Sequence, residues 1–387
     1  MGLIMVALIM IGLVMRSTFT TIPLMLNDLS QALKLPIKTL GILTTIPLAM
    51  FMLISNFASK TIEWLGLKSA TLLILGLLAL GAGLRIITTI PTMLIGTALI
   101  GIAIAHLNVF MPTLVAEYFP QRIGVMTSLY SLAIMAGTII FNLTTASIIA
   151  LTSWHVVIWL LFLIPLAVLI LWFFAMQTLP TRPRPTAKDW KQVKFKTWRN
   201  RRAWPFLIAF GSQSMLNYVF IAWLPVLMAY HHLNSQQIAL GMTMMVITNI
   251  PIALLIPNLV TVLRSKQLLI LVAAITAIGL IAAIMMFFQN DQFSFWLVEA
   301  LLVGIFIGFF FIFTLTMFAV KTQTANQTAA LSGMAQAGGY LLAALGPTAY
   351  GIAYGIDPLG YVQNIVFIAT ILLASAATFL IIKIKHV

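Results

Sequence analysis

The sequence predicts an all-α, polytopic membrane protein with twelve transmembrane helices arranged as two six-helix halves. Three observations lead to this prediction: 62% of the 387 residues are apolar, 7% are charged, and the apolar residues gather into twelve long segments. Soluble domains average about 45–50% apolar and about 25% charged residues. With so few charges the chain cannot cover a soluble surface, which excludes a globular enzyme, a disordered tail and a nucleic-acid-binding protein despite a net charge of +14.

Each apolar segment approaches the roughly 20 residues that a helix needs to cross a bilayer. Helices are expected because an open sheet leaves backbone groups unpaired in lipid, and a barrel shows short alternating segments. The first segment lacks a basic leader and a cleavage site, so we interpret it as a retained span. In chain order the segments are Gly2–Leu24, Ile37–Phe57, Ala70–Thr88, Met93–Val115, Val125–Ile149, Val156–Met176, Trp204–Met228, Ala239–Val262, Leu268–Phe288, Phe295–Val320, Ala329–Tyr350 and Val362–Ile384.

Lysine and arginine orient these spans in a cell membrane. The side that carries both termini and the loops after even-numbered spans holds seventeen basic residues: Lys60, Lys68, Arg122, Arg182, Arg184, Lys188, Lys191, Lys194, Lys196, Arg199, Arg201, Arg202, Arg264, Lys266, Lys321, Lys383 and Lys385. The other side holds three, which are Lys34, Lys38 and Arg85. Because cytoplasmic loops are enriched in basic residues, both termini are predicted to be cytoplasmic.

The halves are predicted to be residues 1–176 and 204–387, joined by a basic cytoplasmic linker at 177–203. An offset of about 203 residues aligns GIAIAHLNVFMPTLV from Gly101 with GIFIGFFFIFTLTMF from Gly304. Near the same offset, Pro23 at the end of the first span matches Pro225 in the seventh. Two repeated halves around a midplane site describe a secondary transporter, and the chain lacks the GxxxxGK[ST] phosphate loop of an energy-coupling ATPase.

Arg16 lies about 20 Å along the first span, at 1.5 Å per residue. An arginine near the bilayer centre costs about 2.5–3.5 kcal/mol on insertion scales. No acidic residue lies within salt-bridge spacing on the same helix, since Asp28 is twelve positions away. Arg16 is therefore a candidate anchor for an anionic or dipolar solute, and the alternatives are an arginine that reaches the head groups or pairs with a carboxylate from another helix.

Two further residues are candidates for proton coupling. His106 is a candidate because histidine side chains titrate near neutrality. The presence of a histidine in this span is explained equally well by a buried neutral ring bonded to a backbone carbonyl. Glu299 lies in the tenth span, where carboxylates often relay protons, but it is close enough to the span end to be a solvated interfacial residue. Asn108 is two residues from His106, about 200° around the helix, so the two cannot share a face, and we favour Asn108 for solute contact.

The remaining candidates for solute binding are polar side chains inside spans. Gln213 and Asn217 share one helix face because they are four residues apart, and Gln336 and Tyr340 have the same spacing. Polar side chains also serve to join packed helices, which is the alternative reading. Tyr130, in the fifth span, and Tyr340 can stack on a flat solute while donating a hydrogen bond.

The segment NVFMPTLVAEYFPQRIGVMTSLYS, from Asn108 to Ser131, resembles the cyanate permease family of the major facilitator superfamily. Further likeness is found in GAGLR ending at Arg85, NYVFIAWLP from Asn217 and LSGMAQAGGYLLAALGP from Leu331. The resemblance extends from the first to the eleventh span and places the family's first-span arginine at Arg16. The loop between spans two and three departs from the superfamily pattern, because NFASKTIEWLGLK has no aspartate at the usual place.

The resemblance implies a carrier for small anionic or polar compounds such as cyanate or nitroimidazoles. The proposed binding residues would line a cavity between the halves and exchange sides by alternating access. The alternative is a proton-coupled multidrug-type efflux carrier, for which an essential carboxylate would be the mark. With no cysteine in the chain, no disulfide, thiol chemistry or cysteine-ligated metal is expected. No other metal or cofactor is expected, and a monomer in the lipid bilayer is sufficient for this fold.

Overall fold

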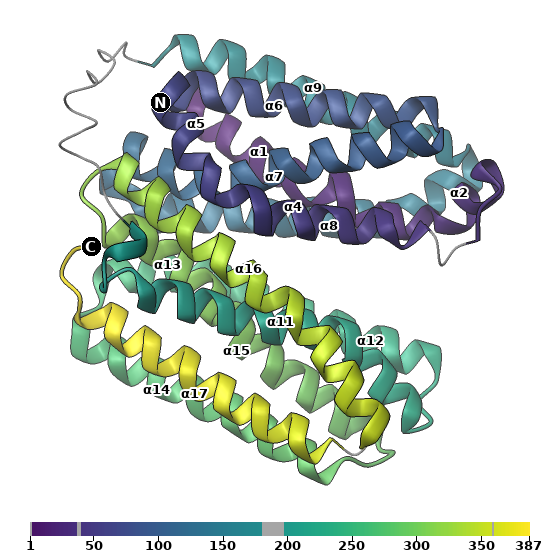
Figure 1. Cartoon of the computed structure of the whole chain (residues 1–387), viewed down its shortest axis with the longest axis vertical. Coiled ribbons are helices and arrows are strands. Elements are labelled where there is room, and N and C mark those ends of the chain that lie inside the picture. Colours follow the sequence, from purple (N-terminus) through teal and green to yellow (C-terminus); the bar gives the residue numbers. More distant parts are fainter. Residues whose placement is uncertain (1, 37–39, 180–196, 358–359) are drawn as a thin grey trace. The chain divides into compact units, whose positions relative to one another are not determined.

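The structure is a computed structural model that describes residues 2–36, 40–179, 197–357 and 360–387. Every regular element in these ranges is a helix (Figure 1). The chain divides into two compact units, one of Met1–Phe119 with Leu129–Phe195 and one of Pro120–Ser128 with Lys196–Val387. Most of the predicted linker, with its basic residues from 182 to 196, lies outside the described residues, as does Lys38, so the linker boundary and the orientation stay predictions.

The first unit contains the helices that correspond to the first six predicted spans. They are α1 (Gly2–Thr20), η1 (Ile22–Met25), α2 (Leu26–Leu33), α4 (Ile42–Ile54), η2 (Ser55–Phe57), α5 (Ala58–Leu65), α6 (Leu67–Leu84), η3 (Arg85–Ile87), α7 (Ile90–Tyr118), most of α8 (Ile123–Leu151) and α9 (Trp154–Gln177). Helix α7 is central to this unit, since it packs against α4 and α6 and also contacts α1 and α5.

The second unit repeats this plan. Its helices are η4 (Pro120–Arg122), η5 (Thr197–Arg199), α11 (Trp204–Tyr230), α12 (Ser235–Ile247), α13 (Asn249–Val262), α14 (Ser265–Met285), η6 (Met286–Phe288), α15 (Phe293–Val320), α16 (Ala325–Ile356) and α17 (Tyr361–Lys383). Helix α15 is central here, because it packs against α11, α12, α13 and α14. Figure 1 shows α14 and α17 side by side, in agreement with their contacts.

Among the described residues, ten helices are long and apolar enough to cross a membrane. Two other predicted spans correspond to α1, whose Gly2–Thr18 part is apolar but shorter, and α16, which carries more polar and small residues. The second span was placed too early: the helices α4, η2 and α5 follow one another from Ile42 to Leu65, so Lys60 and Glu63 lie on α5 and not in a loop.

Two of the predicted spans are interrupted next to a proline. The first span ends as α1 at Thr20, just before Pro23, and the eighth span divides between α12 and α13 at Thr248, just before Pro251. A proline has no N–H to donate to the carbonyl four residues earlier, so the helical ladder is cut at that point. A further helix follows each break, and the hydropathy pattern alone does not reveal the interruption.

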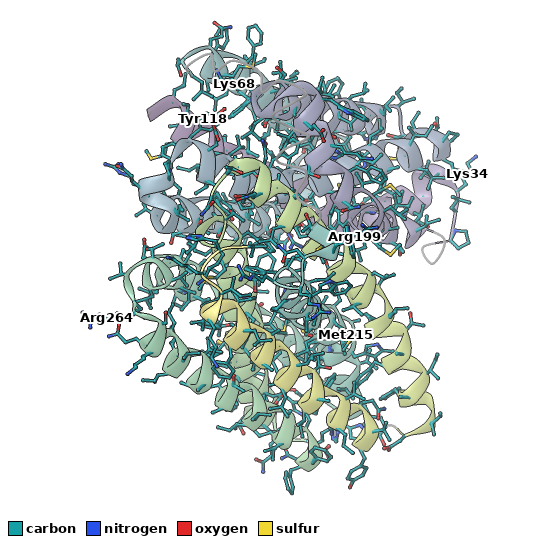
Figure 2. The ribbon with its side chains drawn as sticks, turned by 60° about the vertical axis from the view of Figure 1, so that its left-hand side comes forward. Lys34, Lys68, Tyr118, Arg199, Met215 and Arg264 are labelled. Atoms are coloured by element: carbon teal, nitrogen blue, oxygen red, sulfur yellow. The ribbon has the colours of Figure 1, made fainter. Side chains whose placement is uncertain are left out.

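Lysines bind the ends of the last helix in each unit. In the first unit the Nζ atom of Lys68 donates to the Leu179 carbonyl at 2.9 Å, and Trp172 Nε1 donates to the Lys68 carbonyl at 3.1 Å. In the second unit Lys321 Nζ donates to the carbonyls of Ile382 and Ile384 at 3.1 and 2.6 Å. Helix C-termini carry unpaired carbonyls and partial negative charge, which a lysine complements. Figure 2 shows Lys68 at the first turn of α6.

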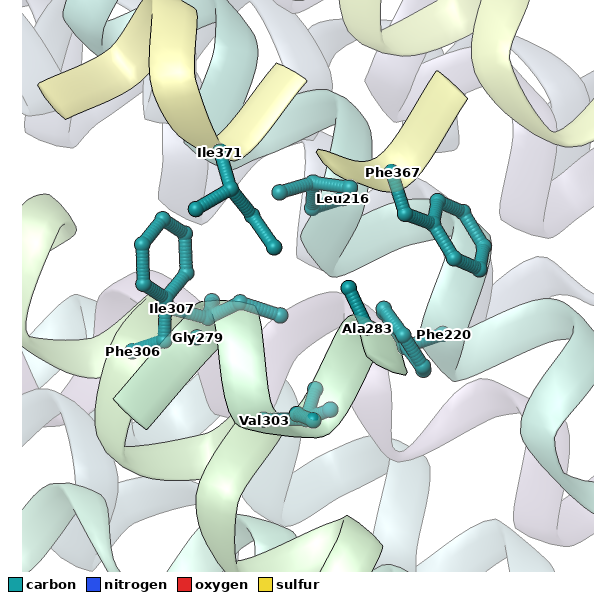
Figure 3. Close-up of a pocket in the computed structure, with 10 residues that line it drawn as sticks. Leu216, Phe220, Gly279, Ala283, Val303, Phe306, Ile307, Phe367 and Ile371 are labelled. Atoms are coloured by element: carbon teal, nitrogen blue, oxygen red, sulfur yellow. The ribbon is translucent and has the colours of Figure 1, made fainter. Parts of the chain in front are cut away.

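The core of the second unit is closely packed around a small apolar void. Aromatic side chains of α15 and α11 meet those of α17, with Phe220 and Phe367 stacked at 4.9 Å between ring centroids. The void has room for about one water, with a volume of about 10 Å³, and lies between α11, α14, α15 and α17 (Figure 3). A wholly apolar lining offers a water no hydrogen bonds, so we interpret this void as a packing defect and not as a binding site.

Candidate functional site

Arg16 lies on α1 with a half-buried side chain. It is one turn from Gly12, where a β-carbon would lie 2.7 Å from the Tyr130 carbonyl oxygen of α8. Residues four apart share a helix face, so Arg16 lies on the face of α1 that packs against α8. The structure thus brings two predicted binding residues, Arg16 and Tyr130, onto neighbouring helices of the first unit.

The regular hydrogen bonding of helix α1 changes just after Arg16. The hydroxyls of Ser17, Thr18, Thr20 and Thr21 each donate to the carbonyl four residues earlier, at 2.7–3.2 Å. Such back-bonding by serine and threonine bends helices. The Thr21 N–H is stretched to 3.4 Å from the Ser17 carbonyl, and the α-helix ends there. Arg16 therefore sits directly before a break in its helix, a context found where transporter helices bind solutes.

His106 and Asn108 face different neighbours on α7, as their spacing predicts. His106 is 6% exposed, with Nδ1 2.9 Å from the Ile102 carbonyl and Nε2 3.1 Å from Thr61 Oγ1 of α5. Asn108 is half-buried and lies two turns from Gly101, the residue of α7 that packs on Pro47 of α4. These hydrogen bonds fit the alternative in which His106 is a buried histidine bonded to a backbone carbonyl.

In the second unit the polar residues lie on α11 and α16. Gln213 and Gln336 are each 1% exposed, and their Nε2 atoms donate to Ser214 Oγ at 2.7 Å and to Ser332 Oγ at 2.8 Å. Asn217 is half-buried. Tyr340 is 6% exposed and lies between two rings of α11, with centroid distances of 5.3 Å to Phe210 and 6.5 Å to Tyr218. Aromatic side chains of α11 and α16 thus form one cluster around Tyr340.

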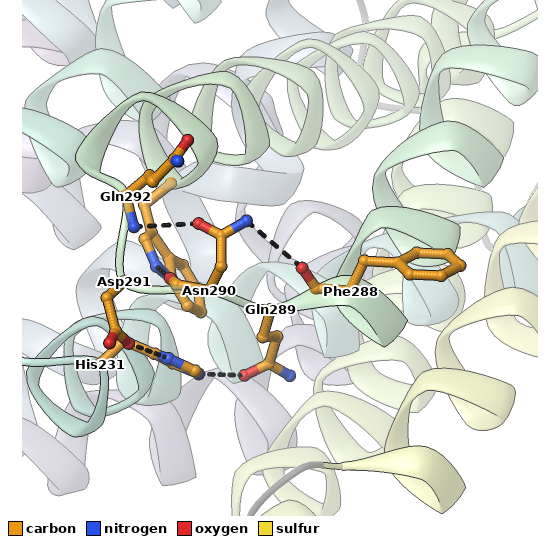
Figure 4. Close-up of polar contacts among 7 residues, drawn as sticks. His231, Phe288, Gln289, Asn290, Asp291 and Gln292 are labelled. Atoms are coloured by element: carbon orange, nitrogen blue, oxygen red, sulfur yellow. Dashed lines mark hydrogen bonds and ion pairs between the residues drawn. The ribbon is translucent and has the colours of Figure 1, made fainter.

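Glu299 is fully buried on α15, which does not fit the alternative of a solvated interfacial glutamate, and its role as a proton-coupling group stays a prediction. In the part of the chain that the structure describes, neither of its carboxyl oxygens has a hydrogen-bond partner. Residues of the loop that follows α14 bond to the end of α11 and to α15 near the same end of the unit, and Trp296 Nε1 of α15 donates to the Asn290 carbonyl at 2.7 Å. His231 bonds Asp291 and Gln289 in that loop at 2.9 and 3.2 Å (Figure 4).

Arg85 was counted among the basic residues of the non-cytoplasmic side, near the end of the predicted third span, and the structure buries it. It is 2% exposed at the end of α6, and its guanidinium bonds Thr18 of α1 and Thr97 of α7. The signal that could have revealed it is its setting, because GAGLR is followed directly by two isoleucines, so the charge has apolar residues on both sides.

Comparisons with known proteins identify the family. The sequence matches the Major Facilitator Superfamily over residues 4–347. The chain belongs to this superfamily. Its structure is similar to that of the major facilitator transporter FucP in the outward conformation, with a TM-score of 0.75, 13% identity, and coverage of 99% of this chain and 98% of that one. The predicted all-α fold of the major facilitator type is thereby confirmed, and the chain is a membrane transporter of this superfamily.

Two relatives indicate which branch of the superfamily the chain resembles. The chain is 30% identical to the 2-nitroimidazole transporter of Escherichia coli (strain K12) over 349 residues, which is 89% of this chain and 86% of that protein. It is 23% identical to the cyanate transport protein CynX of the same organism over 278 residues, 71% of each chain. The resemblance to the cyanate permease family, first seen around Asn108–Ser131, is confirmed by these relatives.

Proposed function

We propose that this protein is a secondary active transporter of a small anionic or polar solute, of the chemical class to which 2-nitroimidazole and cyanate belong. The observation that carries the proposal is Arg16, a half-buried arginine placed before the break in α1. A guanidinium offers five donors in a planar fork, which suits a nitro group, a carboxylate or a linear anion. The similarity to a 2-nitroimidazole transporter supports the same solute class.

In this mechanism the solute neutralises Arg16 and is held by polar side chains on both units. Asn108 and Tyr130 contribute from the first unit, and Gln213, Asn217, Gln336 and Tyr340 from the second. Preferential binding of the solute to one conformation favours closure around it, and release on the other side of the membrane allows the protein to return. Both termini lie in the cytoplasm, and the protein acts in the cell membrane as a monomer.

The test is solute-dependent thermal stabilisation of the purified protein, with 2-nitroimidazole and cyanate as probes. Arg16→Ala should abolish the stabilisation while the protein still folds, and Arg16→Lys should restore little of it because a lysine lacks the bidentate fork. Arg264→Ala is the matched control, since this arginine is exposed at the start of α14 and carries the same charge (Figure 2). Transport that persists in Arg16→Ala would refute the anchor role.

A proton-coupled efflux carrier is the second candidate, and Glu299 is the observation that favours it. Buried carboxylates are normally paired, yet both oxygens of Glu299 lack a partner among the described residues, which suits a group that carries a proton. In liposomes, Glu299→Gln should abolish transport driven by a proton gradient while solute binding remains. Unchanged proton-driven transport in this variant would rule out this role for Glu299.

A further inference from the structure

Arg85 joins three helices of the first unit at a buried point. Its Nη1 donates to the Thr18 carbonyl of α1 at 2.7 Å, and its Nε and Nη2 donate to Thr97 Oγ1 of α7 at 3.2 and 2.7 Å. The stem of the side chain lies on Gly96, where a β-carbon would be 3.1 Å from Arg85 Cγ. The guanidinium is thus enclosed between α1, α6 and α7.

The partners of Arg85 are a hydroxyl and a carbonyl, and the carbonyl explains why a charge is kept there. Thr18 lies in the last turn of α1, and the final carbonyls of a helix lack donors from the helix itself and carry partial negative charge. Pro23 has no N–H to offer, so the neighbouring carbonyl of residue 19 also lacks its usual helical donor. A buried cation at this position complements the broken end of α1.

Thr97 is oriented to receive the guanidinium. Its own hydroxyl hydrogen goes to the Met93 carbonyl at 2.6 Å, which leaves the oxygen lone pairs to accept both Arg85 bonds. Thr97 is fully buried, and Gly96 beside it provides the close approach that the arginine needs. The acceptor, the stem contact and the carbonyl together fix the guanidinium in one place.

We propose that Arg85 is a positioning residue that fastens the broken end of α1 to α6 and α7 and thereby sets the placement of Arg16. Thr18 is two residues from Arg16, about 3 Å along the helix axis, so a shift of this turn moves the Arg16 side chain directly. The fastening of α1 stands on the contacts above, and the consequence for solute binding rests on the proposed function.

The chain has no cysteine, so the fastening can be tested with single spin labels. Leu24→Cys places a label on the exposed face of η1 just beyond the break, and Ile95→Cys places a control label on the exposed face of α7. We expect Thr97→Val, which keeps the side-chain shape, to raise label mobility at position 24 and not at 95. Thr97→Ser keeps the hydroxyl and should restore the wild-type spectrum. Equal mobility in wild type and Thr97→Val, or an equal rise at both positions, would overturn the proposal.

Arg85→Lys provides a second variant with the charge retained. A lysine keeps one donor group and cannot bond Thr18 and Thr97 as a planar fork, so mobility at position 24 should again rise. A spectrum unchanged from wild type would overturn the fork geometry on which the proposal depends.

Transport of 2-nitroimidazole tests whether the fastening of α1 affects solute binding. Thr97→Val should raise KM several-fold with a smaller change in the maximal rate, and Thr97→Ser should return KM to wild type. If Arg16→Ala leaves transport intact while Thr97→Val still loosens position 24, the proposed anchor role of Arg16 fails and the fastening of α1 stands. If Thr97→Val leaves both readouts unchanged, the fastening itself is refuted.

Discussion

Gly211 of α11 and Gly339 of α16 bring two helix backbones into direct contact. A β-carbon on Gly339 would lie 3.2 Å from the Cα atom of Gly211 and 2.5 Å from the Phe210 ring. Small residues at helix crossings of this kind permit the close packing that drives association in lipid. The contact also fixes Tyr340, the next residue, between Phe210 and Tyr218.

Gly339→Ala should therefore lower the free energy of unfolding by about 1–3 kcal/mol, the usual cost of an added methyl group in a packed core. Gly355→Ala is the matched control on the same helix, because a β-carbon there meets nothing within 4 Å. Unfolding in mixed micelles measures both. Equal stability of the two variants would contradict the close crossing.

His106 should depend on Thr61 for its second hydrogen bond. A carbonyl can only accept, so Nδ1 carries a hydrogen toward Ile102, and Nε2 of the neutral ring must accept from the Thr61 hydroxyl. The single Thr61 hydrogen is then not donated to the Phe57 carbonyl, which lies 3.2 Å from Thr61 Oγ1. Thr61→Val should leave a buried nitrogen unpaired and destabilise the protein by about 1–3 kcal/mol. Thr45→Val serves as the control, since this exposed hydroxyl makes a 3.4 Å bond to its own helix end. A loss no larger than the control's would show that the bridge to α5 contributes nothing.

Lys321 should stabilise the end of α17. Its Nζ atom donates to two carbonyls, of Ile382 and Ile384, and its own carbonyl accepts from the Val387 N–H at 3.0 Å. Lys321→Met removes both side-chain bonds and should cost about 1–3 kcal/mol. Lys383→Met, an exposed lysine in the last turn of the same helix, should cost only a few tenths of that. Limited proteolysis of the C-terminus checks whether the end of α17 frays in the first variant alone.

The same lysine predicts a pH dependence of stability. Burial lowers the pKa of Lys321 below its usual value, so the unfolded chain holds the proton at a pH where the folded protein has begun to release it. Stability attributable to Lys321 should therefore rise with pH through the range between the folded pKa and the ordinary lysine value. The neutral amine still has two N–H groups for its two carbonyls. Unfolding midpoints of wild type and Lys321→Met should diverge as the pH is raised, and parallel curves would contradict the prediction.

Much of the helical fold followed from hydropathy, because a backbone in lipid must satisfy its hydrogen bonds within each span. The helix α15 begins two residues before the predicted Phe295 and ends at the predicted Val320. Hydropathy did not show that the spans at Pro23 and Pro251 divide, since apolar residues continue on both sides of each break.

The candidate site was predicted less completely than the fold. Residue type and spacing selected Arg16 and Tyr130, which lie on neighbouring helices, and Tyr340, which has aromatic partners on α11. The burial of Glu299 could not be predicted, because the number of residues to the end of a span does not show which neighbouring helices pack against a side chain.

The sequence by itself determined that this chain is helical, crosses the membrane many times and carries a basic charge in its loops, because these properties depend on composition and on short-range periodicity. Only the tertiary structure decided which charges are buried and what they bind. Arg85 is the clearest case. Its position in the sequence places it near the end of a predicted span, whereas in the structure it is a buried residue that connects α1 and α7. Its partners, Thr18 and Thr97, are 67 and 12 residues away, a distance over which sequence periodicity carries no information.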